Sequence, residues 1–369
     1  MQYTREDGCL AWLACSLLNP DTSATLLQDF GTAEGLYDHL LAHGGEFLKT
    51  YGVSGKVIGT LVKAAARDRM HEMLLQMRKL DAGVLSIDDP RYPDMLRHIQ
   101  QPPTILFYRG NPDCLMGKCI AIVGSRTCSP QGLAVTRRIS RELSQAGVTI
   151  VSGLAMGVDA EAHLGCLEGG SPTAAIMACG IDVDYPMENC DLKERIVREG
   201  GVLLSEYPLG MHGSKHVFQM RNRIISGLAK AVLMMEAQIR SGSMITVQHA
   251  LDQGREVFAY PGVPGSEYAQ GAHQLLREGA NYFTSAQDVL EDLGWSEDTP
   301  MISSAQQKAL PDMTTEQRKI YELLGCGEMS FDELASETGL PAPQLSVSLT
   351  LLQMSGVIRA LPGKAYSRN

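Results

Sequence analysis

The chain has 369 residues, of which 44% are hydrophobic, and its formal net charge at pH 7 is −10. This length predicts two or three domains, and the composition supplies a core of ordinary size. The acidic balance excludes general electrostatic attraction to nucleic acid, so any DNA site has to be a local basic patch.

The cysteines and the N-terminus indicate the compartment. Nine cysteines are scattered along the chain with no Cys-x-x-Cys pair. Their odd number and spacing argue against a disulfide framework and a zinc site, and favour a reducing, cytoplasmic environment. The first residues lack a signal-peptide pattern, and no run of about 18 apolar residues could span a membrane. We expect neither a metal nor another cofactor.

The first block, residues 1–85, is expected to be helical, because apolar residues recur at helical spacing in 10–18 and 57–80. Resemblance to a helix-hairpin-helix around Tyr51–Lys56 stays open as an alternative to a purely packing role.

Residues 86–293 alternate short apolar runs with amphipathic segments. This alternation predicts an α/β domain with an extended Rossmann-like parallel sheet, helices on both faces and a ligand site at the carboxyl ends of the strands. The runs are 119–123, 148–151, 173–177, 202–204, 231–235 and 257–260.

The last part of the chain is predicted to hold a polar linker at 294–313 and a winged helix at 314–369. Its helices are expected at 315–324, 331–338 and 342–355, and its wing at 357–367. The third helix contains no Lys or Arg. Since a helix that reads the major groove normally carries such residues, we favour a protein-interaction or regulatory module over a duplex reader.

The turn that follows the first buried run is a candidate phosphate site. Gly124 permits a sharp turn and close approach, Ser125 precedes a helix whose amides attract anions, and Arg126 offers a bidentate fork. An ordinary strand-to-helix turn with a solvated arginine is the alternative.

A second turn, residues 152–159, contains Gly153, which also suits close approach of a ligand to the backbone. Asp159 and His163 lie four residues apart on one helical face, a spacing found in catalytic pairs. We favour a capping or dipole role for Asp159.

The most informative segment is 207–235, which contains no acidic residue in an acidic chain. Cations that follow a phosphate backbone, with an aromatic ring on which a base stacks, are what single-strand binding needs. A solvated cationic loop with Phe218 in the core is the alternative. The cations are Lys215, Arg221, Arg223 and Lys230.

A fourth candidate follows the run 231–235. Ser241, Gly242 and Ser243 offer amides and hydroxyls at the start of a helix, next to Arg240. Simple N-capping by either serine is compatible with this role.

Together these segments resemble the DNA-processing protein A (DprA/Smf) family. Each short motif is weak, but the ordered set is specific. The matching segments are 120–126, 152–155, 204–208, 221–228, 240–243 and 254–259, with a lead-in at 89–93 and 102–107.

The resemblance implies an extended Rossmann domain between a sterile-alpha-motif-like domain and a winged helix. It also implies sequence-independent binding of single-stranded DNA, protection of incoming DNA and loading of the RecA recombinase in natural transformation and recombination, and a homodimer. Family DNA contacts map onto Arg126 and Lys215, and onto Arg221 and Arg223. Many members have a basic residue where this chain has Met156, which puts one phosphate contact in doubt.

From the motifs and the resemblance together, the predicted DNA-binding residues are Gly124, Ser125, Arg126, Gly153, Lys215, Phe218, Arg221, Asn222, Arg223, Arg240, Ser241, Gly242 and Ser243. No catalytic residue is predicted.

Two other functions stay open. One is a nucleotide-cleaving Rossmann-fold enzyme, similar to a nucleoside monophosphate phosphoribohydrolase, with Glu236 as acid or base near Arg240 and Ser241. The absence of a Pro-Gly-Gly-x-Gly-Thr loop argues against it. The other is a transcription regulator acting through the winged helix, against which the uncharged third helix argues.

Overall fold

The computed structural model describes residues 3–65, 67–296, 314–324, 329–354, 358–361 and 365–368. The chain divides into two compact units, Met1–Thr299 and Pro300–Asn369. Most of the linker predicted at 294–313 and the turn of the predicted wing lie outside the described residues.

The first unit begins with a group of helices. A capping box between Thr4 and Asp7 starts the first of them, and the buried Trp12 donates its indole N–H to the carbonyl oxygen of Leu61 at 2.9 Å. The helices are α1 (Arg5–Ala14), α2 (Pro20–Phe30), α3 (Ala33–His43), η1 (Glu46–Tyr51), α4 (Gly55–Ala64) and α5 (Arg67–Leu80).

A large sheet follows, with the strand order β1-β2-β6-β5-β4-β3-β7-β8-β9. The pairs from β6 through β9 are parallel, which confirms the predicted sheet. Its strands are β1 (Ala82–Ser86), β2 (Ile105–Gly110), β3 (Cys119–Val123), β4 (Thr149–Ser152), β5 (Thr173–Ile176), β6 (Val202–Ser205), β7 (Ala231–Met234), β8 (Glu256–Ala259) and β9 (Asn281–Tyr282).

One edge of the sheet differs from the sequence expectation. β1 pairs with β2, and β2 with β6, in antiparallel fashion. The connection from β1 to β2 holds only the short helix α6 (Asp94–Arg97) among several prolines. A parallel pair needs a crossover, usually a helix, whereas an antiparallel pair does not, so this connection suits the antiparallel edge.

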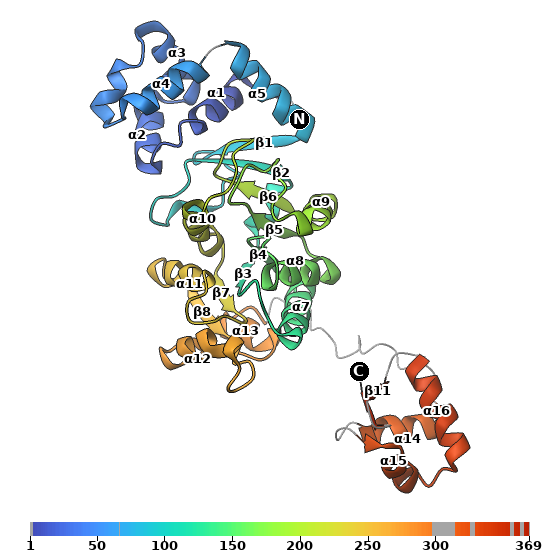
Figure 1. Cartoon of the computed structure of the whole chain (residues 1–369). Coiled ribbons are helices and arrows are strands. Elements are labelled where there is room, and N and C mark those ends of the chain that lie inside the picture. The colour runs from blue at the N-terminus through green and yellow to red at the C-terminus, as the bar shows by residue number, and fades with distance from the viewer. Residues whose placement is uncertain are drawn as a thin grey trace. The chain divides into compact units, whose positions relative to one another are not determined.

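Helices cover both faces of the sheet, as predicted (Figure 1). One face is covered by α7 (Pro130–Gln145), α8 (Val158–Gly169), α9 (Cys190–Arg198) and α13 (Ala286–Asp292). The other face is covered by α10 (Lys215–Gly227), α11 (Ser243–Asp252) and α12 (Gln270–Arg277). Three 3-10 turns, η2 (Pro112–Met116), η3 (Met187–Asn189) and η4 (Glu267–Ala269), lie in the described loops.

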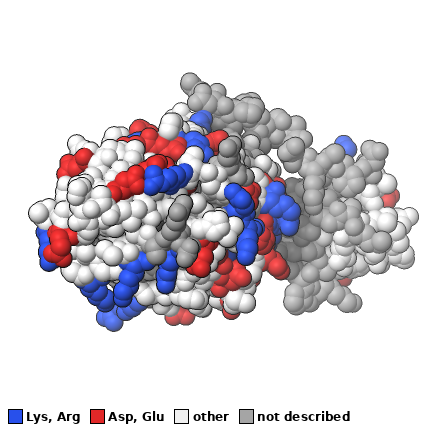
Figure 2. Space-filling view, turned by 90° about the horizontal axis from the view of Figure 1, so that it is seen from above, with Lys and Arg blue, Asp and Glu red and all other residues white. Residues whose placement is uncertain are grey.

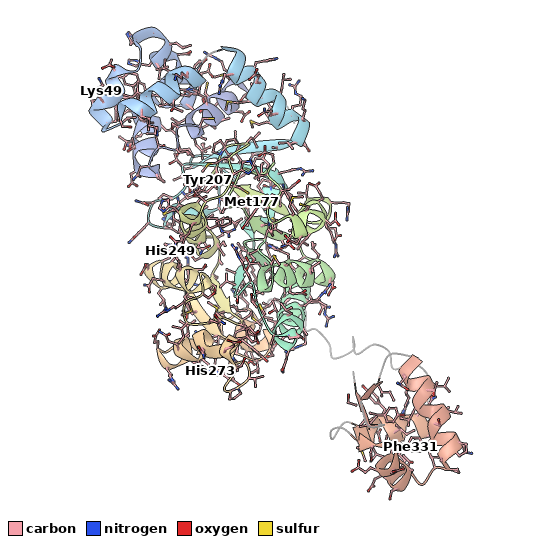
Figure 3. All side chains as sticks on the ribbon, viewed as in Figure 1. Lys49, Met177, Tyr207, His249, His273 and Phe331 are labelled. Atoms are coloured by element: carbon pink, nitrogen blue, oxygen red, sulfur yellow. The ribbon has the colours of Figure 1, made fainter. Side chains whose placement is uncertain are left out.

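The second unit has the winged-helix arrangement predicted from the sequence. Ile320, Leu334 and Leu349 are among the buried residues of its core, against which Phe331 packs (Figure 3). Its elements are α14 (Thr315–Leu323), β10 (Met329–Ser330), α15 (Phe331–Thr338), α16 (Ala342–Met354), β11 (Ile358–Leu361) and β12 (Ala365–Arg368), with strand order β10-β12-β11.

The neighbouring strands β3 and β7 position the site. After β3 the chain continues towards β4 on one side, and after β7 it continues towards β8 on the other. The loops that leave these two carboxyl ends therefore diverge and open a crevice, which is where ligands bind in such sheets.

Candidate nucleic-acid interface

A cavity of about 650 Å³ occupies this crevice. It is lined by the turn after β3, the first turns of α10 and the start of α11. The predicted residues that line it are Gly124, Ser125, Arg126, Lys215, Phe218, Arg221, Asn222, Ser241, Gly242 and Ser243. Three of the predicted residues do not line the cavity, namely Gly153, Arg223 and Arg240.

Two cations in the cavity have free charges. Arg126 and Lys215 are both exposed, and within the described residues neither has an ion-pair partner. The guanidinium carbon of Arg126 lies 5.4 Å from the centre of the Phe218 ring, within the range of a cation–π contact. Elsewhere, on the face shown in Figure 2, positive and negative side chains are intermixed.

Two helix N-termini open onto the same cavity. α10 begins after Ser214 and has no side-chain hydrogen bond at its cap. α11 begins after Gly242, and there the amides of Met244 and Ile245 donate to the carbonyl oxygens of Ser241 and Gly242 at 3.1 and 3.2 Å. By contrast, the hydroxyl of Ser129 accepts from the amide of Gly132 at the start of α7. Amides that lack a capping side chain, together with the helix dipole, attract anions such as phosphate.

The segment before α11 adds polar groups and open space. The hydroxyl oxygens of Ser241 and Ser243 lie 2.8 Å apart, and the amide of Ser243 reaches the Ser241 hydroxyl only at 3.4 Å. A Cβ atom on Gly242 would meet nothing within 4 Å. This glycine therefore leaves the backbone approachable from the cavity.

The turn after β3 is fixed by packing. A Cβ atom on Gly124 would lie 2.5 Å from a methyl carbon of Val158, so only glycine fits there. The amide of Ser125 donates to the carbonyl oxygen of Glu236 at 2.7 Å, and its hydroxyl accepts from the amide of Thr127 at 3.1 Å. The turn thus uses its own polar groups to hold Arg126 at the cavity.

Arg221 lines the cavity but is almost completely buried, so its contact with a phosphate stays a prediction beside a structural role. It is 4% exposed, and its Nη1 donates to the carbonyl oxygen of Gly153 at 2.9 Å and to that of Ile176. Burial lowers the pKa of Arg221, while the Asp159 carboxylate acts in the opposite direction. The guanidinium therefore ties the ends of β4 and β5 together beneath the cavity.

The position of Arg221 explains why residue 153 is a glycine. A Cβ atom there would lie 2.6 Å from Nη2 of Arg221. The glycine makes room for this buried guanidinium, and close approach of a phosphate to its backbone stays a prediction.

Arg223 and Arg240 lie outside the cavity. Arg223 is 3% exposed and donates to a carboxylate oxygen of Glu206 at 2.6 Å, so its charge is neutralised inside the protein. We therefore withdraw it as a DNA contact. Arg240 is exposed, and its contact with DNA stays a prediction.

Asp159 and His163 both have structural partners. The Asp159 carboxylate accepts from the amides of Gly153 and Ala155 at 3.1 and 3.3 Å, and burial raises its pKa. Nδ1 of the fully buried His163 lies 2.7 Å from the Thr173 hydroxyl, and burial lowers the pKa of His163 to about 3. Asp159 lines the cavity but His163 does not, which favours the non-catalytic interpretation.

Glu236, the proposed acid or base of the enzyme alternative, is 3% exposed and does not line the cavity. Its carboxylate accepts from the amide and the hydroxyl of Ser129 at 2.8 and 2.7 Å. Both carboxylate oxygens are engaged at the start of α7, where they have no access to a ligand.

Sequence reasoning missed Tyr185, which lines the cavity from the loop between β5 and α9 and is 43% exposed. Its only sequence signal is its place in a loop that follows a predicted strand. Across the described residues, no group of three or more His, Cys, Asp and Glu residues could hold a metal ion. None of the described helices is long and apolar enough to cross a bilayer.

Comparisons with known proteins agree with this fold. The family model described as DNA recombination-mediator protein A matches residues 83–294, and the DprA winged helix domain model matches residues 304–364. Protein Smf of Synechocystis sp. is 31% identical, over 97% of this chain and 98% of its own length. DNA processing protein DprA of Streptococcus pneumoniae is 44% identical, over 56% of this chain and 73% of its own.

Solved structures give the same result. The X-ray structure of DprA from Streptococcus pneumoniae matches with a TM-score of 0.66 and 33% identity, and covers 79% of this chain and 99% of that one. DNA processing protein A from Helicobacter pylori, described for its single-stranded DNA binding mode, matches with a TM-score of 0.53 and 28% identity, over 58% and 97% of the two chains. This chain therefore belongs to the DprA/Smf family of DNA-processing proteins.

Proposed function

We propose that this protein binds single-stranded DNA, without sequence preference, in the cavity at the carboxyl ends of β3 and β7. The observation that carries the proposal is the convergence of Arg126 and Lys215 beside Phe218, at the N-terminus of α10, which lacks a capping side chain. The binding mode described for the Helicobacter pylori relative supports it.

The chemistry of the cavity favours a single strand. Cations and helix N-termini hold phosphates but carry no sequence information, and stacking on a ring accepts any base. In a duplex the base faces are already stacked on one another, so a ring inside a cavity can reach only an unpaired base.

A titration of a single-stranded homopolymer against a duplex of equal length tests the proposal. Each cation that neutralises a phosphate adds ~0.7 to the salt slope, or about 2.6-fold in affinity between roughly 50 and 200 mM salt. Arg126→Ala and Lys215→Ala should each weaken binding and flatten this slope. Lys230→Ala is the control, because Lys230 is exposed just before β7, at the other end of the strand. Wild-type binding by both variants would refute the site.

We also propose that the protein loads the RecA recombinase onto the bound strand in natural transformation, and that it acts as a homodimer. The family model's description as a recombination mediator supports the first part. Strand exchange by RecA in the presence of a single-strand-binding protein, with and without this chain, measures loading. Sedimentation measures the oligomeric state.

The winged helix is proposed to contact protein. α16 has no Lys or Arg, and Val347 and Leu351 are 60% and 49% exposed on it, four residues apart. Neither feature suits a duplex groove. Duplex binding by residues 314–369 alone would favour a transcription regulator instead.

The nucleotide-cleaving alternative has less support, because Glu236 is engaged by Ser129 away from the cavity. Incubation with nucleoside monophosphates, followed by product analysis, tests it. Turnover that Glu236→Gln abolishes would favour the enzyme.

A further inference from the structure

The main cavity adjoins a small hollow of about 50 Å³. Arg126, Ala155, Tyr185 and Phe218 line both, so the two spaces share a wall. The hollow is more apolar than the cavity, since its other walls include Met156, Met177, Ala178 and Pro186. Met177 is labelled in Figure 3 and is 2% exposed.

Of the two aromatic rings at this junction, Tyr185 has the more accessible surface. Phe218 is half-buried, with Arg126 at 5.4 Å, the Tyr185 ring at 5.2 Å and Gly213 against its edge. Tyr185 is 43% exposed. Both rings line the cavity, and a base that enters it can contact Tyr185 as well as Phe218, which is the more enclosed of the two.

The backbone around Tyr185 is held in place from both sides. The buried Lys193 donates to the carbonyl oxygen of Val183 at 3.0 Å and to the Asp184 carboxylate at 2.9 Å. The side-chain amide of Asn189 donates to the carbonyl oxygens of Leu154 and Ala155 at 2.9 and 3.1 Å. A loop that is held in advance on both sides of Tyr185 loses less freedom when a ligand binds.

We propose that Tyr185 is a base-stacking platform for single-stranded DNA, with Phe218 supporting its ring and Met156 bounding the hollow. Arg126 would hold the phosphate beside the stacked base. This inference rests on the proposed function and adds a contact that recognises base faces. Met156 is 44% exposed and uncharged, so this part of the surface contributes apolar contact that salt does not screen.

The test uses the full-length protein, a single-stranded homopolymer, and the same strand with abasic sites. Tyr185→Ala should reduce affinity for the intact strand by roughly 5- to 150-fold and leave the salt slope unchanged. Tyr185→Phe keeps the ring and should bind within about 3-fold of wild type. For the abasic strand, Tyr185→Ala should bind like wild type, because no base remains to stack.

Met187→Ala is the matched control. Met187 is 72% exposed, lies two residues along the same loop, and lines neither space, so its loss should not change affinity. Tyr185→Ala binding that equals wild type, while Arg126→Ala binds weakly, would overturn the platform and leave the proposed function standing. Equal losses in Tyr185→Phe and Tyr185→Ala would also overturn it. Failure of the wild type to bind any single strand would remove the proposed function as well.

Discussion

Replacing Gly153 with alanine tests whether Arg221 is a structural tie. Gly153 does not have a positive φ, so the backbone itself tolerates alanine. The added Cβ atom would, however, lie 2.6, 2.7 and 2.8 Å from Nη2, Nη1 and Cζ of Arg221. The guanidinium cannot withdraw without losing its bonds to the carbonyl oxygens of Gly153 and Ile176.

The cost follows from these contacts. Overpacking a filled interior destabilises by roughly 1–3 kcal/mol, and a hydrogen bond from a charged group contributes about 1.5–3 kcal/mol. The protein can relieve the overpacking by giving up the hydrogen bonds of Arg221, so the two costs do not simply add. We expect the free energy of unfolding to fall by about 2–4 kcal/mol. At roughly 2–4 °C per kcal/mol, the melting temperature of the first unit should fall by about 5–15 °C.

Calorimetry of the full-length chain measures this change. Gly59→Ala is the control, because Gly59 lies inside α4 with nothing within 4 Å of a Cβ atom, and alanine should stabilise the helix by about 0.5–1 kcal/mol. Should Gly153→Ala melt within a degree of wild type and still bind DNA weakly, the structural interpretation is wrong, and Gly153 serves the ligand.

Three further predictions follow from the same region. Burial lowers the pKa of His163 in the folded protein from the ordinary value of 6.5 to about 3, so the unfolded chain takes up a proton that the folded chain does not. The free energy of unfolding should therefore fall as the pH drops from 6.5 to 3, by up to ~1.4 kcal/mol per pH unit from this residue. In His163→Gln, the free energy of unfolding measured by urea denaturation should depend less steeply on pH, and an unchanged pH dependence would contradict the assignment. Glu236→Gln and Ser129→Ala should each destabilise by about 1–2 kcal/mol, and the double variant by less than their sum because they break one set of bonds; strict additivity in urea titrations would disprove the contact. Met156→Lys should steepen the salt slope of single-strand binding by about 0.7, and an unaltered slope would place Met156 away from the phosphates.

The sequence predicted the parallel part of the sheet because strands buried on both faces are short, uninterrupted apolar runs. β1 and β2 were missed because their connection contains no helical crossover pattern. The loops after β3 and β7 were identifiable as site elements because strand ends meet at one edge.

Which individual side chains face the cavity and which are buried could be learned only from the structure. Lys215, Phe218 and Asn222 share a helical face, which periodicity reveals. That Arg221 is seated over Gly153, and Arg223 against Glu206, depends on segments far away in the sequence. Tyr185 stands in an irregular loop, where no period indicates which way a ring points.

The origin of the two free cations links recognition to folding. Arg126 and Lys215 are separated by 89 positions and line one cavity only in the folded domain. The unfolded chain, with its net charge of −10, offers no such pair and repels a polyanion. A ligand that binds only the native state stabilises it by mass action, by about 2.7 kcal/mol at a hundredfold excess over its dissociation constant. A single strand that binds in the cavity should therefore stabilise the folded protein and raise its resistance to heat and to proteases.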